Sequence, residues 1–224
     1  MRSRFPGSYQ RCGRSVCVAS GLKGACPGTG LASTWACLAE RNFKSGEHGG
    51  GASGLAPASL MITFRPTLAL AKKLELNLSD TIPSIANRAA DWCVQEFRAA
   101  RRTYLLYCNT PSLYPVIALK QGVTDGEALL FNFIMAAEAT LRPTPGAKVF
   151  ELWVQTEMSG IQYLPIPDRS VQGAINDLMR IAQGHLEEGL TPAVASRRAS
   201  MTPMDILGMK SPEAVFPRLR GVSR

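Results

Sequence analysis

The first 60 residues contain no isoleucine, no aspartate and no methionine after Met1, although residues 61 to 224 contain every isoleucine and aspartate of the chain. The same segment holds 11 of the 20 glycines and four of the six cysteines. A segment so poor in large aliphatic side chains, without a sustained hydrophobic period, cannot bury enough apolar surface to offset the entropy of ordering. We therefore expect residues 1 to 60 to be disordered.

A change of composition at Met61 predicts the start of the folded domain. The glycine-rich residues 49 to 54 have the composition of a flexible linker, and the strand-like residues 62 to 64 follow Met61 directly. We therefore expect a single domain over residues 61 to 224. One interpretation is that Met61 is the true start and that residues 1 to 60 are a spurious extension. The other is a natural disordered tail.

Residues 61 to 224 have only a small excess of positive charge. Seven Arg and Lys against two Glu give residues 1 to 60 a charge of +5, which leaves +3 of the total +8 for residues 61 to 224. A charge of this size creates only a weak field for nucleic acid or for a membrane surface. The chain has no run of 18 apolar residues and no signal-peptide core, so we expect a cytoplasmic protein that does not interact with membranes.

Motifs for metals and cofactors are missing. Cys12, Cys17, Cys26 and Cys37 are spaced too irregularly for a zinc knuckle, and residues 61 to 224 contain no Cys-x-x-Cys, no His-x-x-x-His and no phosphate-binding glycine fingerprint. We therefore predict a domain without metal, cofactor or disulfide.

The domain has two cysteines and one histidine, and we interpret all three as structural. Cys93 and Cys108 fall on neighbouring predicted strands, where a buried thiol behaves as a small hydrophobic side chain. Neither has an adjacent cation or helix N-terminus that would lower its pKa. His185 lies on the apolar arc of a predicted helix, where a structural role is favoured over that of a catalytic base.

Hydrophobic periodicity predicts an α+β domain with a small, mainly antiparallel sheet packed against helices. We expect strands over residues 62 to 64, 92 to 98, 103 to 109, 114 to 119 and 161 to 166, the second and third forming a hairpin. The expected helices cover residues 67 to 76, 125 to 141, 149 to 158 and 171 to 188, with a strand as the alternative in the third case. Predicted N-caps are Thr124, Ser170, Thr202 and Ser211, the last two each followed by a proline that starts a short helix.

The strongest candidate site is the start of the helix at residues 171 to 188. Arg169, Ser170, Gly173 and Asp177 gather there, and exposed backbone donors at a positive helix end form an anion site. The structural alternative is that Ser170 only caps the helix and that Gly173 allows another element to approach closely. A second candidate is the hairpin tip, where Arg98, Arg101 and Arg102 either grip phosphate or form an ordinary solvated charge cluster.

The order of these features resembles a bacterial family catalogued as a domain of unknown function. The resemblance rests on an Arg-Ser-x-x-Gly-x-x-Asn-Asp motif (Arg169 to Asp177), on Asp91-Trp92 before a hairpin with a basic turn, on Lys72-Lys73, and on Thr202-Pro203 and Ser211-Pro212. It covers residues 61 to 224. The resemblance implies a shared architecture, but it does not imply any activity.

Three functions are compatible with these patterns. The first is a non-enzymatic binding or interaction module, whose partner is another protein or a small anionic ligand. The second is a small enzyme acting on a phosphorylated or nucleotide substrate, with Arg169 holding the anion and Asp177 or Asp91 as general base. The third is a weak nucleic-acid binder that uses the arginines of the hairpin tip. A ligand site or enzyme requires that Asp91, Trp92 and the residues around Arg169 meet in one cleft.

Overall fold

The computed structural model describes residues 61–79, 87–157 and 160–220. The chain divides into two units, residues 1–54 and 55–224, and the described residues all belong to the second. The expectation for residues 1 to 60 therefore lies outside the described residues.

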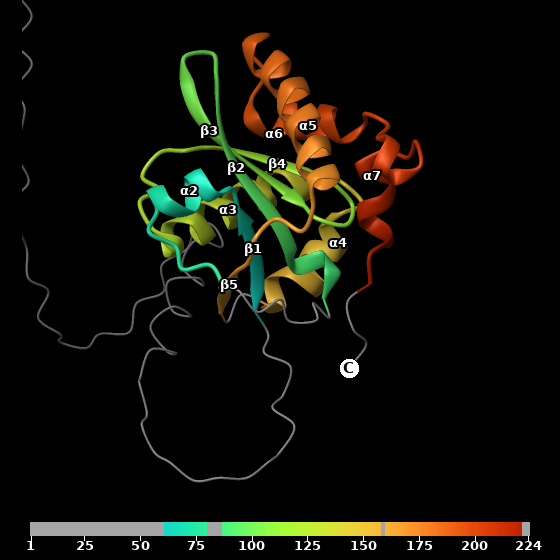
Figure 1. Ribbon diagram of the computed structural model, residues 1–224. Coiled ribbons are helices and arrows are strands. Elements are labelled where there is room, and N and C mark those ends of the chain that lie inside the picture. Colours follow the sequence, from blue (N-terminus) through green and yellow to red (C-terminus); the bar gives the residue numbers. More distant parts are fainter. Residues whose placement is uncertain (1–60, 80–86, 158–159, 221–224) are drawn as a thin grey trace, which may run out of the picture. The chain divides into compact units, whose positions relative to one another are not determined.

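A five-stranded mixed sheet forms the centre of the domain, with the strand order β4-β3-β2-β1-β5 (Figure 1). Its strands are β1 (Ile62–Pro66), β2 (Asp91–Ala99), β3 (Arg102–Asn109), β4 (Pro115–Leu119) and β5 (Ile161–Tyr163). The antiparallel pairing of β2, β3 and β4 confirms the predicted hairpin and its third strand. Strand β1 pairs in parallel with β2 on one side and with β5 on the other.

Helices cover both faces of the sheet, so the domain has two hydrophobic cores. One core contains Trp92 and Val94 of β2 together with Leu129 and Phe133 of α3 (Gly126–Leu141). The other contains Cys93 of β2 and the apolar side of α5 (Arg169–Glu187), with α6 (Pro192–Ser200) beside it. Alternate residues of a strand point to opposite faces, so each central strand supplies both cores. In Figure 1, α5 and α6 lie on one side of the strands and α3 on the other.

The remaining helices are short. They are α2 (Leu68–Lys73), α4 (Ala147–Val149) and α7 (Pro212–Val215). A π-helical turn (Phe150–Val154) and a 3-10 turn (Gln155–Glu157) continue α4, so the helical interpretation of this stretch holds and the strand alternative is wrong. Further 3-10 turns cover Arg88–Ala90, Asp205–Leu207 and Phe216–Arg218.

Three predicted N-caps are wrong. Asp125 and Asp168 cap α3 and α5 in place of Thr124 and Ser170, because a carboxylate three positions before a free amide accepts its hydrogen bond: Asp125 from Ala128 at 2.9 Å, and Asp168 from Val171 at 2.9 Å. No helix starts at Thr202, where a turn leads into the bridge between Met204 and Lys210. Ser211 does precede α7 with a proline in its first turn, as predicted.

Helix α6 was not predicted, although Thr191-Pro192 repeats the hydroxyl-proline start that the sequence shows at Ser211. It shields the edge strand β4, because the Ser196 hydroxyl accepts a hydrogen bond from the Ile117 amide at 2.8 Å. On the opposite edge, the Ser79 amide donates to the Tyr163 carbonyl at 2.9 Å. Both edges therefore have some of their backbone groups paired, which limits strand addition.

Candidate functional site

A groove runs between the first half of α5 and the segment from Thr202 to Ile206. Its volume is about 430 Å³. Three of the residues predicted as a site, Ser170, Gly173 and Asp177, line one wall. The other lining residues are Ala174, Ile181, Thr202, Pro203, Met204, Asp205 and Ile206. The predicted motif therefore does form part of a concave surface.

The groove combines apolar side chains with two carboxylates. Ala174 and Met204 are buried at its base, and Ile206 is 44% exposed. Asp177 and Asp205 are the ionisable residues among its lining, and both are exposed. Asp177 also pairs with Arg180 at 3.1 Å, but both side chains are mostly in solvent, and such a pair is weak and exchanges easily. The lining thus carries negative charge beside apolar surface.

The positive end of α5 is already occupied by a carboxylate of the chain itself. Oδ1 of Asp168 accepts hydrogen bonds from the Ser170 hydroxyl at 2.6 Å and from the Val171 amide at 2.9 Å. The hydrogen bond from the Ser170 hydroxyl, followed by that from the Val171 amide, lowers the pKa of Asp168 below its usual 3.8. An anionic ligand would face this carboxylate at close range, so the geometry does not favour the predicted anion site.

Gly173 is exposed, and a Cβ built on it would meet no atom within 4 Å. The alternative in which this glycine allows another element to approach closely is therefore wrong. The backbone of α5 at Gly173 instead faces the open groove. A residue without a side chain at this point leaves the concave surface unobstructed.

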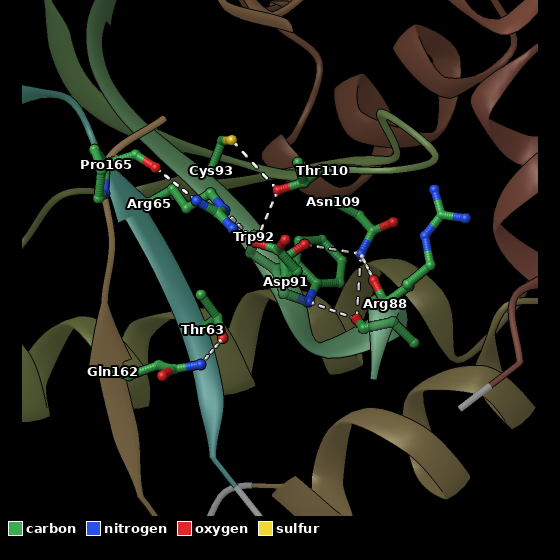
Figure 2. A network of polar contacts seen from close by, with 11 residues as sticks. Thr63, Arg65, Arg88, Asp91, Trp92, Cys93, Asn109, Thr110, Gln162 and Pro165 are labelled. Carbon is green, nitrogen blue, oxygen red and sulfur yellow. Dashed lines mark hydrogen bonds and ion pairs between the residues drawn. The ribbon is translucent and has the colours of Figure 1, made fainter. Parts of the chain in front are cut away.

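Asp91, the first residue of β2, lies in a buried polar network with Arg65 of β1 and Thr110, which follows β3 (Figure 2). Its Oδ1 accepts a hydrogen bond from Arg65 Nε at 2.8 Å and another from the Thr110 hydroxyl at 3.0 Å. Arg65 Nη1 also donates to the Pro165 carbonyl at 2.6 Å. The side chains of Arg65 and Asp91 are only 5% and 9% exposed. Burial raises the pKa of Asp91 above its usual value, against the opposing effect of Arg65.

Trp92 points away from this network into the core under α3. Its indole nitrogen donates to the Ala89 carbonyl at 2.9 Å, and its ring meets Phe133 edge to face at a centroid distance of 4.8 Å. The side chain is fully buried. Neighbouring strand residues face opposite sides of a sheet, so Asp91 and Trp92 cannot share one surface. The structure does not bring Asp91, Trp92 and the α5 motif together.

The remaining predicted site residues lie apart from the groove lining. Arg169 is exposed at the start of α5 and is not among the lining residues. Arg98, Arg101 and Arg102 are exposed at the hairpin tip and form no ion pair within the described ranges. The Arg98 carbonyl accepts a hydrogen bond from Gln183 at 3.0 Å, which places the tip near the C-terminal half of α5.

The two described cysteines lie opposite each other in the β2–β3 ladder and are both free and buried. Burial raises the pKa of Cys93 to about 12 and that of Cys108 well above its usual value. A thiol held in this form is a poor nucleophile. His185 is partly exposed, with Nδ1 at 3.5 Å from a carboxylate oxygen of Glu188.

Sequence reasoning missed one wall of the groove and the partner of Asp91. Residues 202 to 206 were assigned to a helix start, and nothing local links them to α5 about 30 positions earlier. Arg65 stands in a strand of otherwise buried residues. A charged residue in a strand of buried residues indicates a buried ion pair, so the sequence of β1 does predict an acidic partner for Arg65.

A metal cluster and a membrane-spanning helix are both absent from the described part of the chain. Within residues 61–79, 87–157 and 160–220, no three His, Cys, Asp or Glu side chains gather as a metal site would require. In the same ranges no helix has the length and apolar character needed to cross a bilayer.

Comparison with known proteins gives a family and nothing more specific. No curated protein and no solved structure matches the chain. Residues 63–218 match the family described as "Domain of unknown function (DUF6933)". This range begins at the second residue of β1 and ends with the last 3-10 turn, so it includes both walls of the groove and the Arg65–Asp91 pair. The chain therefore belongs to the DUF6933 family.

Proposed function

We propose that residues 61 to 224 form a non-enzymatic binding module, which holds a short segment of a partner protein in the groove between α5 and residues 202 to 206. The observation that carries this proposal is the composition of the groove, in which Asp177 and Asp205 stand beside an apolar base formed by Ala174 and Met204. Such a lining is complementary to a segment that has a lysine or arginine next to an aliphatic side chain.

The arrangement of the acidic residues supports binding over catalysis. Asp91, one of the two candidate general bases, is buried beside Arg65 and Thr110 and is not among the residues that line the groove. The other, Asp177, is exposed and hydrogen bonded only to Arg180 among the described residues. General acid–base and nucleophilic chemistry use a base beside a reactive group that a substrate can reach. The hydroxyl beside Asp91 belongs to Thr110, which does not line the groove, and the hydrogen-bond partner of Asp177 is the cation of Arg180.

Peptide selection from a random library displayed on phage, with the purified chain as bait, tests the proposal. We expect the selected peptides to carry Lys or Arg beside an aliphatic residue. Fluorescence anisotropy then gives the affinity of a selected peptide for the wild type and for Asp177→Lys and Asp205→Lys. Because like charges would face each other, each substitution should weaken binding by about tenfold or more. Binding should also weaken as the salt concentration rises.

Glu187→Lys is the matched control, because Glu187 is an exposed carboxylate at the far end of the same helix. It changes the net charge equally and should leave the affinity within about twofold. Selection of acidic peptides, or equal losses in all three variants, would contradict the proposal. If neither Asp177→Lys nor Asp205→Lys changes the affinity of the selected peptides, the peptides bind outside the groove.

A further inference from the structure

Helix α3 has an outer face with large apolar side chains that the described residues leave exposed. The ten residues 128 to 137 contain no charged side chain. Leu129, Phe133 and Ala137 face the sheet and are fully buried. On the opposite side, Phe131 is 64% exposed and Met135 is 55% exposed. Large apolar side chains on the outer face of a helix are normally covered, so among the described residues this surface is a candidate contact site.

The exposed residues form one continuous band that winds gradually around the helix. Phe131, Met135 and the exposed Ala139 follow one another at intervals of four, and we call them the α3 stripe. Glu127 lies at the N-terminal end of the stripe and Arg142 at its C-terminal end, both exposed. At 100° per residue these five positions fall within an arc of about 120°.

This arrangement is complementary to itself. If two α3 helices pack antiparallel about a two-fold axis at Met135, Phe131 of one copy lies opposite Ala139 of the other, so a large side chain meets a small one. Glu127 is about 12 Å and Arg142 about 10 Å from Met135 along the axis, at 1.5 Å per residue. The two charged residues therefore lie at nearly the same distance from the two-fold axis, with a difference of one residue. Glu127 of one copy consequently lies opposite Arg142 of the other.

The charges at the ends select this antiparallel pairing. In a parallel pair, Glu127 would face Glu127 and Arg142 would face Arg142, which is unfavourable. Arg142 already pairs with Glu138 within its own helix. In the antiparallel pair it stands between that carboxylate and Glu127 of the second copy, so both ends of the contact gain an attractive interaction.

We propose that the α3 stripe binds a second copy of this chain and forms a two-fold symmetric dimer. The contact is independent of the groove, because α3 and α5 belong to the cores on opposite faces of the sheet. A helix of 16 residues is about 24 Å long and presents on the order of 300 Å² per copy, which is below the roughly 800 Å² of a standard interface. The dimer is therefore weak and forms only at high protein concentration.

Sedimentation velocity of the full chain over about 5 µM to 1 mM, with a reducing agent because residues 1 to 60 contain four cysteines, tests the proposal. The wild type should shift from monomer to dimer across this range. Met135→Glu places two carboxylates on the symmetry axis and should raise the dissociation constant at least tenfold. Met201→Glu is the matched control, since Met201 is 59% exposed and lies outside α3. It should associate like the wild type.

A charge reversal tests the orientation of the helices. Glu127→Arg alone and Arg142→Glu alone should each weaken the dimer, and the double variant should recover to within about threefold of the wild type. A wild type that stays monomeric at 1 mM overturns the proposal. Equal effects of Met135→Glu and Met201→Glu, or no recovery in the double variant, overturn it as well. Circular dichroism of each variant establishes that it is folded.

Discussion

Replacing Gly126 by alanine is a sharp test of the packing around α3. Alanine is normally the better helix former, by up to about 1 kcal/mol in a helix interior. Gly126 is the first residue of α3, and a Cβ built there would lie 2.2 Å from the Tyr163 hydroxyl oxygen and 3.2 Å from its Cζ. A contact this short forces the tyrosine to move.

The tyrosine is not free to move without cost. Its ring is partly buried and stacks on Phe64 at a centroid distance of 6.5 Å. Overpacking of this kind costs typically 1–3 kcal/mol, whereas the helix gain is small at a first position. We therefore expect Gly126→Ala to lower the free energy of unfolding by about 1–2 kcal/mol, which corresponds to a midpoint shift of roughly 2–8 °C for a domain of this size.

Removal of the hydroxyl should rescue the variant. In a Tyr163→Phe background the 2.2 Å contact is gone and the nearest remaining ring atom is Cζ at 3.2 Å, which needs an adjustment of only a few tenths of an ångström. Urea unfolding of the wild type, both single variants and the double variant gives the coupling free energy, which should favour the double variant by about 1 kcal/mol or more. If Gly126→Ala is as stable as the wild type, or equally damaging in both backgrounds, the packing argument is refuted.

Three further predictions concern the helices and the buried ion pair. Gly173→Ala and the matched Gly184→Ala should each raise the free energy of unfolding by about 0.5–1 kcal/mol in urea titrations, because a Cβ at either position would meet no atom within 4 Å. A lower free energy of unfolding for Gly173→Ala would mean that the groove is closed at this point. Arg65→Met should lower the free energy of unfolding by about 3–5 kcal/mol, because it leaves Asp91 buried without its cation. The double variant with Asp91→Leu should recover part of this loss, and additive losses in the two single variants would contradict the pairing. Hydrogen bonds lower the pKa of Asp168 in the folded state, so its stabilisation is present above the usual pKa of 3.8 and is lost as the pH falls through the lowered folded pKa. Thermal unfolding of Asp168→Ala should therefore show less acid sensitivity than that of the wild type below about pH 4.

Local periodicity in the sequence was enough to identify the main elements. Helices α3 and α5 show apolar residues at helical spacing, and β2 and β3 flank a short basic turn, so each is specified by residues close together in the chain. The same local rule could have separated Asp91 from Trp92, because consecutive strand residues face opposite sides of a sheet. Placing both residues in one site overlooked that alternation.

At α3 and α5 the capping residue was predicted at the right helix start but not at the right position. Thr124-Asp125 and Asp168-x-Ser170 each offer two polar side chains, and the sequence alone does not say which one reaches a free amide. In both cases the aspartate accepts the amide hydrogen bond and the hydroxyl donates to it. The choice depends on the backbone angles at the helix start.

By itself, the sequence determined the boundaries of the central hairpin, the two long helices and the α+β class, because these follow from repeating patterns over about 5 to 20 residues. Only the tertiary structure decided that β1 pairs in parallel with β2 and β5, that Arg65 neutralises Asp91, and that residues 202 to 206 complete the groove on α5. Each of these contacts joins segments about 25 to 100 positions apart. Such contacts are set by how the two cores pack on the sheet, and no local pattern encodes them.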